Sequence, residues 1–134
     1  MNDATPNIPE VVEEIRTLFE AYEQALIDKN VDVLDATFWN SPHTIRLANH
    51  EHGYGFDRIH AHRVARPPGP GSKEKRHRLD IVTIGRDVAI VTLVYKVRGQ
   101  EMTGRQMQTW VRLPDVGWKV VAAHVSMIDR EPTL

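Results

Sequence analysis

The run W-K-V-V-A-A-H-V-S-M, from Trp118 to Met127, decides the fold. It is rich in β-branched and small apolar residues and has no helical spacing, which is typical of a strand. Short turn sequences separate it from three similar runs earlier in the chain. The runs are Leu79 to Ile84, Val88 to Val97 and Arg105 to Leu113, and the turns are at 85–87, 99–100 and 114–117. Four extended runs with short connections predict an antiparallel meander.

Upstream of the meander the pattern is helical. From Glu10 to Lys29 the apolar residues recur three or four positions apart, which predicts an amphipathic helix. Shorter helices are expected at Asp32 to Trp39 and Asp57 to Ala65, with a strand from His43 to Ala48 between them. Helices followed by antiparallel strands predict an α+β domain in which the helices cover one face of the sheet. We expect one domain over residues 1–134.

Composition excludes several classes of protein. The 134 residues carry 17 Lys and Arg against 18 Asp and Glu, so the net charge is −1, which argues against a nucleic-acid-binding protein. No apolar run is long enough to span a bilayer, and the start, MNDATPNIPE, does not resemble a signal peptide. We expect a cytoplasmic protein without membrane contact. The lack of cysteine excludes disulfides, thiolate metal sites and cysteine nucleophiles.

Two residues in the first half of the chain could carry chemistry. Tyr22 falls on the apolar stripe of the first helix, so its ring should point inward and its hydroxyl needs a partner there. It is either a core tyrosine bonded to the backbone or a proton donor. Arg46 alternates with Ile45 and Leu47 on the first strand, and spacing alone allows a surface position or one facing a pocket. A pocket-facing Arg46 would need an anion.

The third helix and the strand from Arg105 supply further candidates. Arg63 and Arg66 extend the stripe begun by Phe56 and Ile59, so they either reach solvent or hold an anionic substrate. Alternation places Gln106, Gln108, Trp110 and Arg112 on one strand face, which is consistent with a wet pocket lined by Gln and Trp.

The last strand offers a weaker pattern. Alternation puts Val121, Ala123, Val125 and Met127 on one face and Trp118, Val120, Ala122, His124 and Ser126 on the other. His124 and Ser126 lack a nucleophile elbow, which favours structural hydrogen bonding over catalysis.

Histidine spacing does not favour a metal site. His60 and His62 point in different directions on a helix, and His50 and His52 lack a recognisable third ligand. Gly53-Tyr54-Gly55 is expected to be a turn, and no phosphate-binding or dinucleotide motif is present.

Four motifs are similar to those of a known family. They are Y-E-Q-A-L at 22–26, F-W-x-x-P-x-T-I-R at 38–46, R-x-A-R-P at 63–67 and G-R-Q-x-Q-T-W-V-R at 104–112. On these the chain resembles the AtzH-like family, which includes the HpxZ proteins of oxalurate catabolism and the 1,3-dicarboxyurea hydrolase of cyanuric acid degradation. The order of elements, with Trp118 opening the final run, resembles the nuclear-transport-factor-2-like (NTF2-like or SnoaL-like) cone fold shared with ketosteroid isomerase and polyketide cyclases.

The resemblance implies a small pocket inside a curved antiparallel sheet capped by three N-terminal helices. It implies no cofactor, no metal and a small anionic urea-derived substrate made by a partner amidase. The matched motifs carry over Tyr22 and Arg46 as catalytic residues. Substrate contacts are expected from Arg63, Arg66, Gln108 and Trp110.

The activity implied is decarboxylating hydrolysis of 1,3-dicarboxyurea to allophanate. The alternative is a non-catalytic accessory or assembly protein for a partner amidase. An isomerase or cyclase is disfavoured, because the sequence offers no evident inward carboxylate base. A broad sheet face carrying Trp110 or Trp118 would also favour a homodimer or higher homo-oligomer.

Overall fold

The computed structural model describes residues 3–66, 76–96 and 102–129. The helices are α1 (Pro9–Asp28), α2 (Val31–Thr37) and α3 (Phe56–Ala65). The strands are β1 (Ile45–Ala48), β2 (Glu51–Tyr54), β3 (Arg76–Ile84), β4 (Val88–Lys96), β5 (Thr103–Leu113) and β6 (Gly117–Ile128). The predicted helices and the predicted strands of the meander are therefore present, while the predicted turn at Gly99-Gln100 lies outside the described residues.

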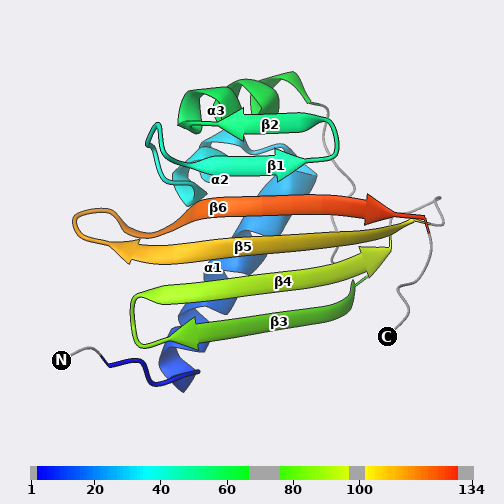
Figure 1. Cartoon of the computed structure of the whole chain (residues 1–134). Helices are drawn as coiled ribbons and strands as arrows, with labels where there is room; N and C mark the ends of the chain where they lie inside the picture. The colour runs from blue at the N-terminus through cyan, green and yellow to red at the C-terminus, as the bar shows by residue number, and fades with distance from the viewer. Residues whose placement is uncertain (1–2, 67–75, 97–101, 130–134) are drawn as a thin grey trace.

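The strands form one curved sheet in the order β2-β1-β6-β5-β4-β3 (Figure 1). The meander from β3 to β6 is antiparallel, as predicted. Strand β1 pairs with β6 in parallel, so the sheet is mixed rather than wholly antiparallel. Strand β2 pairs antiparallel with β1 along Glu51–Tyr54, where a turn at Gly53-Tyr54-Gly55 was expected. The expectation was wrong because pairing with β1 imposes an extended conformation on a segment with little intrinsic strand propensity.

The helices cover one face of the sheet, which we call the inner face. Helix α1 runs diagonally behind β3 to β6, and α2 and α3 lie at the end formed by β1 and β2 (Figure 1). Pro9 starts α1, and Asn30 caps α2 by accepting a hydrogen bond from the Val33 N–H at 3.2 Å. Pro9 and Asn30 thus mark where α1 and α2 begin.

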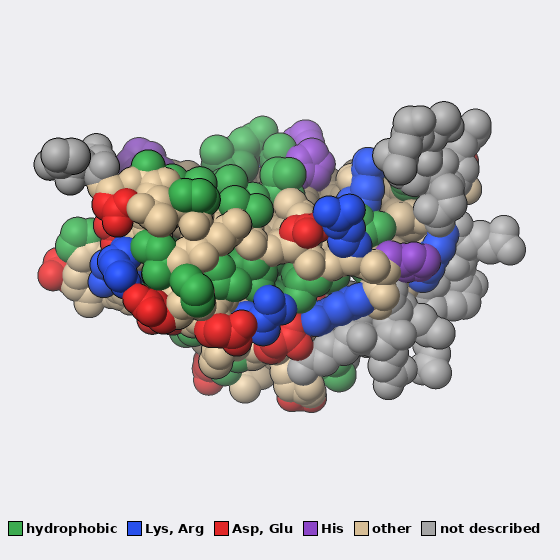
Figure 2. All heavy atoms as spheres, turned by 90° about the horizontal axis from the view of Figure 1, so that it is seen from below, with side chains coloured by type: hydrophobic (Ala, Val, Ile, Leu, Met, Phe, Trp, Pro, Cys, Tyr) green, Lys and Arg blue, Asp and Glu red, His purple; other side chains and the backbone are tan. Residues whose placement is uncertain are grey.

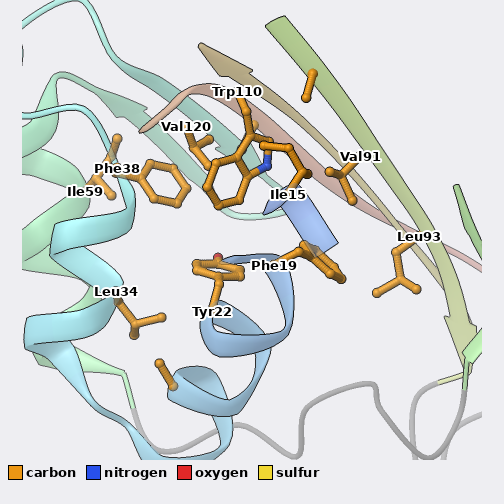
Figure 3. Close-up of a cluster of buried hydrophobic side chains, with 13 residues drawn as sticks. Ile15, Phe19, Tyr22, Leu34, Phe38, Ile59, Val91, Leu93, Trp110 and Val120 are labelled. Carbon is orange, nitrogen blue, oxygen red and sulfur yellow. The ribbon is translucent and has the colours of Figure 1, made fainter. Parts of the chain in front are cut away.

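The core lies between α1 and the inner face. Tyr22, Phe19 and Ile15 of α1 face Trp110 of β5 and Val91 of β4 (Figure 3). Each of these side chains is at most 1% exposed. The burial of Tyr22 follows the helical spacing seen in the sequence, and its ring brings a hydroxyl into this apolar cluster.

A bulge in β6 changes which residues face inward. The pairing of β5 with β6 shifts between Thr109 and Trp110, so that Val121 is the extra residue. Val120 is buried on the same face as Ala123, while His124 is exposed. The predicted faces of β6 were therefore wrong before the bulge, while Ala123, Val125 and Met127 share the inner face as predicted.

The edge strand β3 carries charge of both signs. Arg78 and Asp80 form an exposed ion pair at 2.6 Å along this strand. Figure 2, seen from the β3 side, shows basic and acidic side chains intermixed with hydrophobic ones. Charged side chains on an edge strand hinder pairing with another sheet.

Candidate functional site

A cavity of about 400 Å³ opens between the helices and the inner face. Its wall includes Tyr22 from α1, Arg46 from β1, Glu51 from β2, Gln106 from β5, and Arg66 at the end of α3. Residues distant in the sequence meet here because β1 lies beside β6 and α3 packs on β2. The cavity thus combines cations, a tyrosine and a carboxylate.

Arg46 points inward. It is 8% exposed, and its Nη1 donates a hydrogen bond to Oε2 of Glu51 at 2.7 Å. Burial opposes the charged guanidinium, but attraction to and hydrogen bonding with Tyr22 and Glu51 raise the pKa of Arg46 above its ordinary value. Arg46 is therefore a fixed cation beside the Tyr22 hydroxyl.

Arg63 also lies near Tyr22 and is 4% exposed. Its Cζ is 4.2 Å from the ring centroid of Phe38 and 6.0 Å from that of Tyr22. Nη1 and Nη2 are both buried and make no hydrogen bond with any described residue. Burial, together with the nearby Arg46, lowers the pKa of Arg63, although Tyr22 and Asp35 act in the opposite direction. A buried cation without a hydrogen-bonded partner favours binding of an anion.

Arg66 has a different environment. It is exposed and lies on the cavity wall just beyond α3. Of the two arginines on the predicted stripe of the third helix, Arg63 is thus buried in the protein and Arg66 is exposed to solvent.

Gln108 and Trp110 are buried on the inner face of β5. The indole N–H of Trp110 donates to Oε1 of Gln108 at 3.0 Å, which fixes the orientation of the amide. Nε2 of Gln108 consequently points elsewhere and has no partner. Gln108 and Arg46 flank Ala123 in the sheet register, so a small side chain separates the two polar groups.

The residues just described differ in their relation to the cavity. Gln106, two positions before Gln108 on the same face, lies on its wall. Gln108, Trp110 and Arg63 lie behind that wall, in the packed interior. The wet pocket lined by Gln that the strand pattern predicted therefore involves Gln106, with Trp110 in the core.

Glu51 is a charged cavity residue that sequence reasoning missed. The segment around it was expected to be a loop, and an inward carboxylate was thought to be lacking. The structure corrects this, because β2 places Glu51 beside Arg46. Only its position five residues after Arg46, a spacing suited to a tight hairpin, could have indicated the pairing.

Other sequence candidates lie outside the cavity. His124 is exposed, and Ser126 accepts a hydrogen bond from Nε of Arg105 at 3.2 Å. His60 Nδ1 lies 2.6 Å from Asp35 Oδ2. Among residues 3–66, 76–96 and 102–129, no group of three or more histidine and acidic side chains is placed to hold a metal ion.

A larger hollow of about 840 Å³ lies against the other side of α1. Leu18, Val33 and Trp118 line it, and the indole N–H of Trp118 donates to Glu14 at its rim. The buried cations lie elsewhere, so the smaller cavity is the better candidate for chemistry.

Comparisons with known proteins agree with the fold. A cystatin-like fold protein from Burkholderia xenovorans LB400 is 39% identical with a TM-score of 0.89, over 96% of this chain and 99% of that one. A protein of unknown function from Pectobacterium atrosepticum SCRI1043 is also 39% identical, with a TM-score of 0.86 over 92% of this chain and 94% of that one.

A more distant likeness shows the fold alone. An NTF2-like superfamily protein from Salmonella enterica serovar Typhimurium LT2 is 21% identical, with a TM-score of 0.69 over 87% of this chain and 90% of that one. Comparison with curated proteins gives no match. No described helix is long and apolar enough to cross a membrane. The sequence model of the AtzH-like family matches residues 4–131, and the chain is therefore a member of that family with an NTF2-like fold.

Proposed function

We propose that this protein catalyses the decarboxylating hydrolysis of a small N-carboxylated urea, 1,3-dicarboxyurea, to allophanate and bicarbonate. The observation that carries the proposal is a pair of buried guanidinium groups beside Tyr22: Arg46 on the cavity wall, and Arg63 behind it, whose Nη1 and Nη2 make no hydrogen bond with a described residue. An enclosed cation of this kind favours a carboxylate ligand.

The charge of the site suits a small dianion. Arg46 and Arg63 both lie near Tyr22, and Arg66 is exposed on the wall of a cavity of about 400 Å³. Arg46 would orient the carboxylate that leaves, because a planar guanidinium matches a planar carboxylate. Gln106, on the cavity wall, would contact the carbonyl, and Gln108 lies behind the wall with its amide fixed by the bond from Trp110.

The step we propose breaks the bond between nitrogen and the carboxyl carbon. The electron pair stays on nitrogen, which takes a proton from the Tyr22 hydroxyl, and the carboxyl group leaves as carbon dioxide. Water then converts carbon dioxide to bicarbonate and returns a proton to Tyr22. One dicarboxyurea dianion and one water thus give one allophanate and one bicarbonate, so that atoms and charge balance.

Tyr22→Phe tests the proposal most directly. It keeps the ring and its contact with Phe38, whose centroid is 5.9 Å away, and removes only the hydroxyl. Loss of one hydrogen bond should lower the free energy of unfolding by about 0.5–1.5 kcal/mol. Loss of a proton donor should lower the turnover of fresh 1,3-dicarboxyurea by about 10²- to 10⁴-fold, measured as allophanate and bicarbonate above the spontaneous rate.

Tyr54→Phe is the matched control, because Tyr54 is 63% exposed and not on the cavity wall. It should turn over substrate at the wild-type rate. Wild-type turnover by Tyr22→Phe would make its hydroxyl structural. A wild type that never exceeds the spontaneous rate would instead favour the accessory role beside a partner amidase.

A further inference from the structure

Glu51 has one carboxylate oxygen that no group among residues 3–66, 76–96 and 102–129 hydrogen-bonds. Its side chain is 16% exposed, and Oε2 accepts the hydrogen bond from Arg46. Oε1 is buried and has no hydrogen-bond partner. Buried carboxylate oxygens are nearly always hydrogen-bonded, so an unbonded one on a cavity wall indicates a missing donor.

Gly53 makes room for this arrangement. A Cβ on Gly53 would lie 2.9 Å from Cγ1 of Ile59 and 3.0 Å from the carbonyl oxygen of Arg46, both closer than normal contacts, and 3.6 Å from Oε1 of Glu51. Glycine therefore lets α3 approach β2 closely over the Glu51 side chain. The position of Glu51 is a packed feature of the fold.

The neighbouring histidine does not supply the donor. Nδ1 of His62 lies 4.0 Å from Oε2, which is beyond hydrogen-bond distance, and it approaches the oxygen that Arg46 already holds. Among the described residues no group donates to Oε1, so this acceptor is left for a ligand.

We propose that Glu51 determines specificity by accepting a hydrogen bond from a ligand N–H, so that the site selects carboxylated ureides over methylene analogues of the same shape and charge. This rests on the proposed function, which supplies the anionic ligand. A carboxylate oxygen only accepts hydrogen bonds, and a CH₂ group in place of N–H would leave Oε1 unbonded. In this proposal the arginines bind the carboxylates of the ligand, whereas Glu51 binds the N–H group between them.

Acetone-1,3-dicarboxylate is a suitable probe, because it replaces both N–H groups of 1,3-dicarboxyurea with CH₂ at the same charge. Glu51→Gln is the variant, since the bond from Arg46 holds the amide oxygen in the place of Oε2 and leaves an NH₂ donor in the place of Oε1. It should lower kcat/KM for 1,3-dicarboxyurea by about tenfold to a hundredfold. The inhibition constant of acetone-1,3-dicarboxylate should stay the same or improve.

Glu20→Gln is the matched control. Glu20 also accepts a hydrogen bond from an arginine, Arg76, at 2.7 Å, but it does not line the cavity. This variant should change neither constant. If Glu51→Gln weakens both ligands alike, or neither, with an active wild type, the inference is wrong and the proposed function stands. A wild type that does not accelerate the reaction overturns both.

A second measurement needs only the wild type and covers the case in which Glu51→Gln does not fold. N-carbamoylglycine and succinamate are stable monoanions that differ by one N–H against one CH₂. Calorimetry should give at least about tenfold tighter binding of N-carbamoylglycine. Equal affinities, or no binding of either by an active enzyme, would overturn the role of Glu51.

Discussion

Each face of the sheet carries some residues of the kind that is more usual on the other face. The inner face, under the helices, carries Arg46 and Gln108, both less than 10% exposed. The outer face carries Ile45, Val82 and Met107, which are 40%, 40% and 54% exposed. Buried polar groups and exposed apolar patches are less common than buried apolar and exposed polar ones, so each is a stronger sign of a functional site or an interface.

The outer patch is continuous across the strands. The pairing register aligns Val82, Ile90, Thr109, Ala122 and Ile45 in one row from β3 to β1. Trp110 and Trp118, which the sequence placed on such a face, lie instead in the core and against Glu14. We propose that the buried arginines of the inner face serve ligand binding at a cost in stability, and that the exposed apolar residues of the outer face form a protein contact.

Arg63→Met should have the largest effect, because it removes the buried cation that has no hydrogen-bonded partner at Nη1 or Nη2. Replacing a buried charge by an apolar side chain of similar size is often neutral or stabilising, so we expect urea unfolding to show a gain of about 0–2 kcal/mol. Loss of the carboxylate contact should lower kcat/KM by about a hundredfold or more. A destabilised variant with wild-type turnover would show that Arg63 serves the fold.

Arg46→Lys should have the next largest effect. An ammonium keeps the charge but cannot contact Glu51, Tyr22 and a carboxylate in one plane. We expect a folded protein whose kcat/KM falls by about tenfold to a hundredfold. Arg112→Lys is the control, since Arg112 makes an exposed pair with Asp87 at 2.7 Å, and equal losses in both variants would contradict a role for Arg46 in the site.

The regular parts of this fold could be predicted from the sequence. The spacing in α1 placed Tyr22 inward, and the extended runs gave the antiparallel meander, because both patterns depend on local burial. The parallel pairing of β1 with β6 depends on contacts between residues far apart in the chain, which periodicity does not report. For the same reason the sequence did not decide whether Arg46 faces solvent or a pocket.

Glu51 could not be predicted for a related reason. Its strand, E-H-G-Y, has no β-branched residue and is extended because β1 lies beside it. The bulge at Val121 likewise reverses the expected faces of the first part of β6. The family resemblance suggested roles for Tyr22 and Arg46, but the position of Glu51 beside Arg46 could be identified only from the structure.

Met107→Glu tests the outer face. We propose that this face joins two copies of the chain, sheet against sheet, so that a wild-type homodimer or larger oligomer forms at micromolar concentration. A buried, unpaired glutamate at the contact should weaken association by at least about tenfold, measured by analytical ultracentrifugation. Because Met107 is exposed within one copy, the free energy of unfolding of a single chain should change by no more than about 0.5 kcal/mol.

Val116→Glu is the control for that variant, since Val116 is 55% exposed but lies in the turn between β5 and β6. It should leave association unchanged. A wild type that sediments as a monomer would show that the outer patch has another role.

Tyr95→Phe should have the smallest effect and concerns the inner face at high pH. Tyr95 lines the cavity, and its ring lies where a Cβ on Gly104 would have to be, so the aromatic ring fills the space that glycine leaves. Burial raises the pKa of Tyr95, and electrostatic interaction with Glu23 and Tyr22 adds to this, while Arg46 and Arg66 act against it.

A tyrosine whose pKa is higher in the folded state than in the unfolded state stabilises the fold fully below the unfolded pKa of about 10, and this contribution is lost as the pH rises through the folded value. The wild type should therefore lose more stability between pH 8 and pH 11 than Tyr95→Phe, measured by urea unfolding at each pH. Tyr54→Phe, with its exposed ring, should lose as much as the wild type. An equal loss in all three proteins would mean that the Tyr95 hydroxyl reaches water freely, and the cavity would then be wetter at its β4 side than the burial of its wall indicates.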